Sequence, residues 1–163
     1  MTDFAVSANR ILNEGVRAAL FSGQRGVEYR PALCAWENEL FRQFSQGHQL
    51  LDENAASALI AQIFAACGRK APMLELVAGF DDPQIGGIAD VEGHRIVIET
   101  GCLYRYLVLH EIAHLLVPED HHHGPAFTYV LQSLYRSYLQ IPEEGIRVLL
   151  EKNGLPAYTQ LPN

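Results

Sequence analysis

The sequence predicts an α+β fold in which a small antiparallel sheet, part of it a hairpin, packs against helices. Two observations predict this class. Apolar residues recur at helical spacing in the first and last parts of the chain, and short apolar runs typical of strands lie between them. No internal repeat, low-complexity tract or linker divides the 163 residues. We therefore expect a single domain over residues 1–163.

Three helices are expected before residue 70. Apolar residues recur at helical spacing within residues 4–21 and again within residues 33–44. Asp52 has a side chain that caps helix N-termini, and Gly68 can adopt the left-handed conformation that often ends a helix. The third helix is therefore expected between Asp52 and Gly68.

The strands are expected after Pro72. Residues 73–78 form a short apolar run, and residues 85–90 and 94–98 form two further runs. The segment between the last two, Val91-Glu92-Gly93, is typical of a turn. These two runs therefore predict a hairpin.

Three more helices are expected in the last part of the chain. Residues 103–116 are strongly apolar, and Pro118 cannot extend the helix that they predict. Pro125 suits the first position of a helix that continues to about Leu139. A last helix opens at Pro142 and stops at Gly154.

Charge and cysteine content exclude several classes of function. The formal net charge is −7, and only two of the twelve basic residues are lysines, so a nucleic-acid partner is not expected. The three cysteines form no C-x-x-C pair, which argues against a zinc ribbon, and their odd number gives no disulfide framework. We see no signal peptide and no run of membrane-spanning length. We therefore expect a cytoplasmic protein with reduced thiols and no membrane partner.

One motif indicates chemistry. His110 and His114 are four residues apart, so on a helix they lie about 40° apart around the axis, one turn along, and can reach one Zn²⁺. Glu111 lies beside this pair, where a carboxylate can take a proton from water that the metal activates. The flanking residues are apolar, which predicts a buried helix. The alternative is a core helix with two hydrogen-bonded histidines and a glutamate at its rim.

A catalytic zinc ion usually has three protein ligands and one open position. His121, His122 and His123 follow the predicted helix, and His123 directly precedes Gly124 at the start of the next one. We predict His123 as the third ligand, with His122 as the second choice and His121 as the third. Four side chains that follow or flank this ligand are candidates for stabilising an oxyanion: Tyr129, Tyr135, His121 and His122. Tyr104 and Tyr106, which precede the motif, are further candidates, although packing is the usual role of a tyrosine.

Acidic residues are weaker candidates for the third ligand. Asp120 has the spacing of the H-E-x-x-H-x-x-G-x-x-H enzymes, but Val117 occupies the position where that pattern needs glycine. Glu143 and Glu144 lie about thirty residues downstream, and their place in a first helical turn is explained by the helix dipole.

The combination of His110-Glu-x-x-His114 with His123-Gly-Pro-x-Phe127 resembles the SprT-like and related short zincin metallopeptidases. This resemblance covers about residues 73–140. It implies a zincin-like fold, zinc ligands His110, His114 and His123, and Glu111 as general base. It also implies that the hairpin of residues 85–98 supplies an edge strand to which an extended polypeptide substrate can add. DNA-repair members of the group carry basic and zinc-ribbon segments, which this chain does not show.

The sequence and the resemblance together predict a zinc-dependent metallohydrolase, with endopeptidase activity as the first hypothesis. Residues 51–163 would form its catalytic core and residues 1–50 a helical N-terminal extension. The alternative is a zinc-stabilised binding or regulatory protein with little or no turnover. Retention of Glu111 favours the enzyme, because a purely structural zinc site does not need that base. A metal hydrolase with a non-peptide substrate is a third hypothesis.

Overall fold

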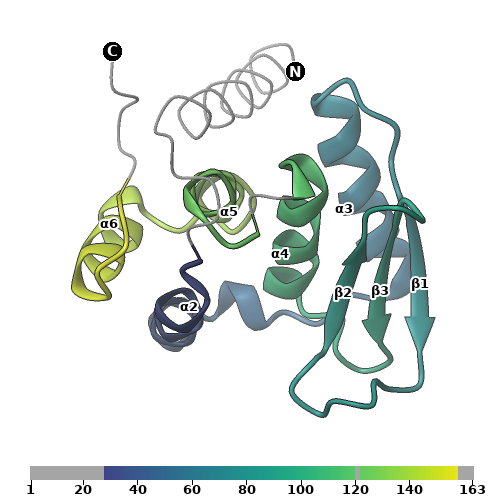
Figure 1. Cartoon of the computed structure of the whole chain (residues 1–163), viewed down its shortest axis with the longest axis horizontal. Helices are drawn as coiled ribbons and strands as arrows, with labels where there is room; N and C mark the ends of the chain where they lie inside the picture. Colours follow the sequence, from purple (N-terminus) through teal and green to yellow (C-terminus); the bar gives the residue numbers. More distant parts are fainter. Residues whose placement is uncertain (1–27, 120–121, 158–163) are drawn as a thin grey trace.

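The computed structural model describes residues 28–119 and 122–157 (Figure 1). Their elements, in chain order, are α2 (Arg30–Gln43), the short 3-10 helix η1 (Ser45–His48), α3 (Glu53–Ala66), β1 (Met73–Val77), β2 (Gly87–Asp90), β3 (Arg95–Glu99), α4 (Arg105–Leu116), α5 (Pro125–Tyr138) and α6 (Glu143–Lys152). The predicted α+β class is confirmed at this level. The helix expected over residues 4–21 lies outside the described residues.

Local sequence signals set several helix ends where we predicted them. The Asp52 carboxylate accepts a hydrogen bond from the Ala55 N–H at 2.7 Å and caps α3. Gly68, after the end of α3, has a φ of 65°, and Gly154, after the end of α6, has a φ of 71°. Both glycines thus adopt the left-handed conformation that ends helices. Pro125 is the first residue of α5.

The sheet is mixed, which corrects the expectation of an antiparallel sheet. The predicted hairpin is present, with β2 antiparallel to β3, but β1 pairs with the other side of β3 and runs parallel to it. Residues 78–86 therefore carry the chain past the position of β3, which is inserted between the two earlier strands. The apolar pattern of a strand carries no information about its direction, so this pairing was not visible in the sequence.

The two faces of the sheet differ in burial. Ile96 and Ile98 of β3 are fully buried against the helices. On the opposite face, the Arg95 guanidinium bridges the carboxylates of Glu75 on β1 and Asp90 on β2, at 2.6 and 2.7 Å. The inner face therefore fixes the sheet against the helical layer.

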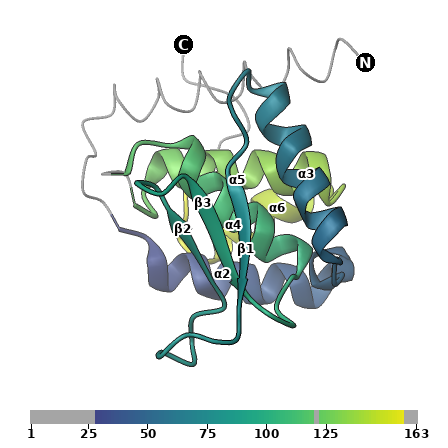
Figure 2. The ribbon, with the colours of Figure 1, turned by 90° about the vertical axis from the view of Figure 1, so that its right-hand side faces the viewer.

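Helix α4 lies between the sheet and α5 (Figures 1 and 2). Its residues Val108, Leu109 and Ile112 are fully buried. Helix α2 contributes to the same hydrophobic core, and its Trp36 is fully buried. The core thus includes a helix that we expected in an N-terminal extension over residues 1–50. No helix in the described part of the chain is long and apolar enough to cross a membrane.

Candidate metal centre

Helix α4 presents His110, Glu111 and His114 to an open pocket of about 560 Å³. The pocket lies between α2, β2, α4 and the segment that leads into α5. The helix is held in place by its apolar residues, which pack into the core on its other sides. The polar residues of the motif therefore lie on the one face of α4 that is not covered by the core.

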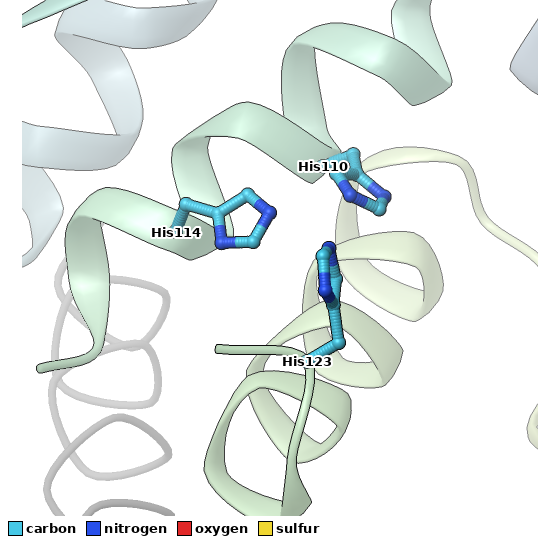
Figure 3. Close-up of side chains that lie close together, drawn as sticks. All are labelled: His110, His114 and His123. Carbon is cyan, nitrogen blue, oxygen red and sulfur yellow. The ribbon is translucent and has the colours of Figure 1, made fainter. Parts of the chain in front are cut away.

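The structure brings His110, His114 and His123 together, and we refer to these three residues as the histidine cluster. One ring nitrogen of each histidine lies within 4.8 Å of a ring nitrogen of each of the other two. In Figure 3 the rings of His110 and His114 project from α4 toward the ring of His123, which precedes α5. The buried ring of Phe127 lies against all three imidazoles, with centroids 4.3–5.0 Å away. This packing limits the positions that the three rings can take.

Two members of the cluster are held neutral. Burial, reinforced by the nearby imidazoles, lowers the pKa of His114 to about 2. Burial also lowers the pKa of His123, and the charge of His110 acts in the same direction. Both rings therefore offer a nitrogen lone pair at neutral pH, which is the form that binds a metal ion.

His110 is different, because it contacts a buried carboxylate. Its Nδ1 lies 3.0 Å from Oε1 of Glu37 on α2, and Glu37 is only 7% exposed. Burial alone would lower the pKa of His110, but the charge of Glu37 and this hydrogen bond outweigh it and raise the pKa to about 9. The buried Tyr135 hydroxyl donates a second hydrogen bond to the same oxygen of Glu37. With Nδ1 turned to Glu37, Nε2 of His110 is the nitrogen available to an ion.

His123 also contacts a carboxylate, from the segment that precedes α2. Its Nδ1 lies 3.2 Å from Oε1 of Glu28, which accepts a further hydrogen bond from the Arg30 N–H at 2.8 Å. The Tyr29 N–H donates to the His123 carbonyl oxygen at 3.3 Å. The segment that leads into α2 therefore fixes both the backbone and the ring of the third histidine.

Glu111 lies beside the cluster, between α4 and the edge of the sheet. It is 5% exposed, and the Ala89 N–H of β2 donates a hydrogen bond to its carboxylate. Gly87 allows this approach, since a Cβ at that position would lie 3.2 Å from the Glu111 carboxylate. Burial raises the pKa of Glu111, although the charge of His110 acts in the opposite direction. A carboxylate with a raised pKa is a suitable proton acceptor and donor near neutrality.

The other predicted ligands are not in the cluster. His122 lines the pocket, but its side chain is exposed and it is not in the histidine cluster. Glu143 and Glu144 lie at the start of α6 and pair with Arg136 and Arg147. His121 and Asp120 lie outside the described residues.

The tyrosines that we considered as oxyanion stabilisers differ in whether they reach the pocket. Tyr135 is fully buried and its hydroxyl is turned to Glu37. Tyr106, one turn before His110 on α4, lines the pocket. Tyr129 is buried on α5. Of these three, only Tyr106 is among the residues that line the pocket.

Sequence reasoning missed Glu37 and Glu28. A signal for Glu37 was present, because it falls between Leu33, Leu40 and Phe41 on the apolar side of its helix. A carboxylate on a buried helix face needs a partner, although the sequence does not show which one. Glu28 stands in a polar segment before α2 and carried no such signal.

A cation bound by the histidine cluster would have three imidazole ligands, a carboxylate beside it and an open pocket in front of it. We compared the chain with protein-family models, curated proteins and solved structures. The function of this site is inferred from its geometry, because no family model, no curated protein and no solved structure matches the chain.

Proposed function

We propose that this protein is a zinc-dependent hydrolase that cleaves peptide bonds, with a zincin-like arrangement of α4 and the sheet. The observation that carries the proposal is the convergence of His110, His114 and His123 on one face of an open pocket, with Glu111 beside them. The three histidines would hold the ion, and Glu111 would act as the general base.

The donor set suits zinc. Zn²⁺ binds imidazole nitrogens at about 2.0–2.1 Å, so nitrogens around a tetrahedral ion lie roughly 3.4 Å apart. The ring nitrogens of the cluster lie within 4.8 Å of one another, and we expect rotation of the rings to close the remaining distance. If bound there, Zn²⁺ would act as a Lewis acid and would lower the pKa of a bound water molecule to about 7.

Glu111 is placed to move protons. Its buried carboxylate has a raised pKa, and the hydrogen bond from the Ala89 N–H keeps it between α4 and β2. From this position it would accept a proton from the attacking water and later donate it to the leaving amine. General base catalysis of this kind contributes about 10²–10⁴-fold to the rate.

The edge of the sheet supports a peptide substrate. The Glu99 N–H donates to the Gly86 carbonyl oxygen at 2.9 Å, so in the antiparallel pairing the backbone groups of Gly87 and Ala89 point away from β3. The Ala89 N–H is used by Glu111, which leaves the N–H and carbonyl of Gly87 and the carbonyl of Ala89 for a substrate. Gly87 and Ala89 both line the pocket. Backbone groups at the free edge of a sheet can pair with an extended peptide. Such a peptide would lie across the pocket, next to the histidine cluster.

A zinc-stabilised binding or regulatory protein is the second candidate. Structural zinc sites close the fourth position with protein. Among the described residues, the cluster offers three ligands and faces a pocket, which favours the enzyme.

The test combines zinc analysis with a peptide assay. We expect the purified chain to contain about one zinc ion, to hydrolyse members of a mixed fluorogenic peptide library, to lose this activity with 1,10-phenanthroline, and to regain it with added Zn²⁺. Stoichiometric zinc without hydrolysis would support the binding or regulatory protein. Absence of stoichiometric zinc would contradict both candidates.

Above pH 9, where His110 no longer carries the proton that Glu37 stabilises, Glu37→Gln should lower zinc affinity by about 10–100-fold, the usual effect of removing a group that orients a metal-bound histidine. The substitution keeps the shape of the side chain but removes the charge beside His110 Nδ1. Glu39→Gln is the matched control, because Glu39 lies on the same helix and pairs with Lys152 of α6 instead. Competition against a chromophoric chelator measures both affinities. Equal affinities for the two variants would remove Glu37 from the site.

Zinc affinity should rise with pH. In the zinc-free protein His110, with a pKa of about 9, carries a proton at pH 7 that must leave when the ion binds. His114 and His123 have lowered pKa values and are already neutral at pH 7, so they release no proton when the ion binds. We therefore expect the apparent association constant to increase about tenfold per pH unit between pH 7 and 9 and then level off. Competition with a chelator at several pH values measures this constant. A constant that did not change between pH 7 and 9 would show that His110 is neutral in the zinc-free protein and would contradict the prediction.

A further inference from the structure

Four residues of α2 form one stripe along the pocket. Arg30, Cys34, Glu37 and Phe41 are spaced at helical intervals, and all four line the pocket. Glu37 lies beside His110, while Glu28 and Tyr29, next to Arg30, contact His123. Phe41 packs against Tyr106, with ring centroids 4.8 Å apart. Helix α2 therefore runs past the histidine cluster, with Arg30 at one end of the pocket and Phe41 at the other.

The two ends of the pocket differ in chemistry. The Phe41 end is aromatic, since the rings of His48 and Tyr106 lie 5.8 and 4.8 Å from that of Phe41. At the other end, Arg30 is the one lysine or arginine among the described residues that line the pocket. The chain as a whole has a net charge of −7, so this cation is a local exception in an acidic protein.

The Arg30 side chain lines the pocket and is exposed, so a ligand in the pocket can reach it. Its guanidinium is hydrogen-bonded to the Cys34 thiol, one turn along the stripe. The carboxylates nearest to it in the chain are already engaged. Glu37 accepts hydrogen bonds from His110 and Tyr135, and one oxygen of Glu28 contacts His123 and the Arg30 N–H.

We propose that Arg30 binds a carboxylate of the substrate, so that the pocket selects peptides with an acidic group near the bond that is cleaved. The inference rests on the proposed function, because the position of the cleaved peptide bond is set by the histidine cluster and the β2 edge. A guanidinium offers two parallel N–H donors that match the two oxygens of a carboxylate. An amide in place of the carboxylate has one oxygen and no charge, so it would bind the guanidinium more weakly. The carboxylate could belong to an Asp or Glu side chain or to the C-terminus of a short peptide.

The test uses fluorescent peptides that carry a hydroxamate, a group that binds zinc, on the zinc-loaded full chain. The two probes of a pair differ only in having Glu or Gln at one position, which is the first, second or third residue from the hydroxamate. One set of pairs carries the peptide on one side of the hydroxamate, and a second set carries it on the other side. A further pair compares a free C-terminal carboxylate with its amide. Binding is measured by fluorescence polarisation for the wild type, Arg30→Gln and Arg42→Gln. Arg42 is the matched control, because it lies on α2 but does not line the pocket.

We expect a carboxylate in at least one position to tighten binding about fivefold, the upper range for an exposed ion pair. Arg30→Gln should remove this preference and Arg42→Gln should keep it, and added salt should weaken it. A preference in the Glu/Gln pairs identifies a side chain, and one in the terminal pair identifies a C-terminus. Equal binding of all paired probes, or a preference that survives Arg30→Gln, overturns the inference alone. If no hydroxamate binds the zinc-loaded chain, the proposed function fails with it.

Discussion

Glu111→Gln should abolish most peptide hydrolysis while leaving zinc bound. The amide occupies the same volume, which matters because Gly87 lies so close that a Cβ there would be 3.2 Å from the Glu111 carboxylate. It can still accept the hydrogen bond from the Ala89 N–H, but it cannot take a proton from water. We expect the turnover number to fall by about 10²–10⁴-fold. Zinc content and hydrolysis rate, measured on the same preparation, give the two readouts.

Glu119→Gln is the control for this change. Glu119 lines the same pocket but is exposed at its rim, beyond the end of α4. Its substitution should leave the rate near that of the wild type. Hydrolysis by Glu111→Gln within a few-fold of the wild type would exclude Glu111 as the base, even if zinc binding were intact.

His123→Ala should produce the largest loss of zinc affinity among single changes outside α4. It removes one of three imidazole ligands, and we expect a loss greater than the roughly 100-fold upper range for groups that only orient a ligand. Alanine also loses the contact with Glu28 and the packing against Phe127. Titration with Zn²⁺ in competition with a chelator measures the change.

The neighbouring residue provides the comparison. His122→Ala removes an imidazole that lines the pocket but is exposed and not in the histidine cluster. Its zinc affinity should stay within a few-fold of the wild type. Circular dichroism of both zinc-free variants would separate loss of a ligand from loss of folding. If His122→Ala weakened binding as much as His123→Ala, the assignment of the third ligand would be wrong.

Local chemistry explains which parts of the fold could be predicted from the sequence. Asp52, Gly68, Pro125 and Gly154 act through their own backbone or the next turn, so they mark helix ends without knowledge of the tertiary structure. The parallel pairing of β1 with β3 depends instead on how residues 78–86 cross the sheet. That path is set by packing between distant segments, which the pattern of one strand does not encode.

The same distinction applies to the candidate site. His110, Glu111 and His114 could be identified because their spacing on one helix fixes their relative positions. His123 could be chosen from three adjacent histidines because it stands at the start of a helix. The contact between Glu37 and His110 joins residues 73 positions apart, so only the tertiary structure shows it.

Helix α2 has a consequence for any attempt to isolate or transfer the H-E-x-x-H segment. A fragment that begins after Gln43 would retain all three histidines and Glu111 but would lose Glu37, Glu28 and the buried Trp36. Two of the three imidazoles would then be without the carboxylates that orient them. The minimal sequence for the proposed activity therefore starts no later than Glu28, and grafting the motif onto another scaffold would require a second helix with a correctly placed acid.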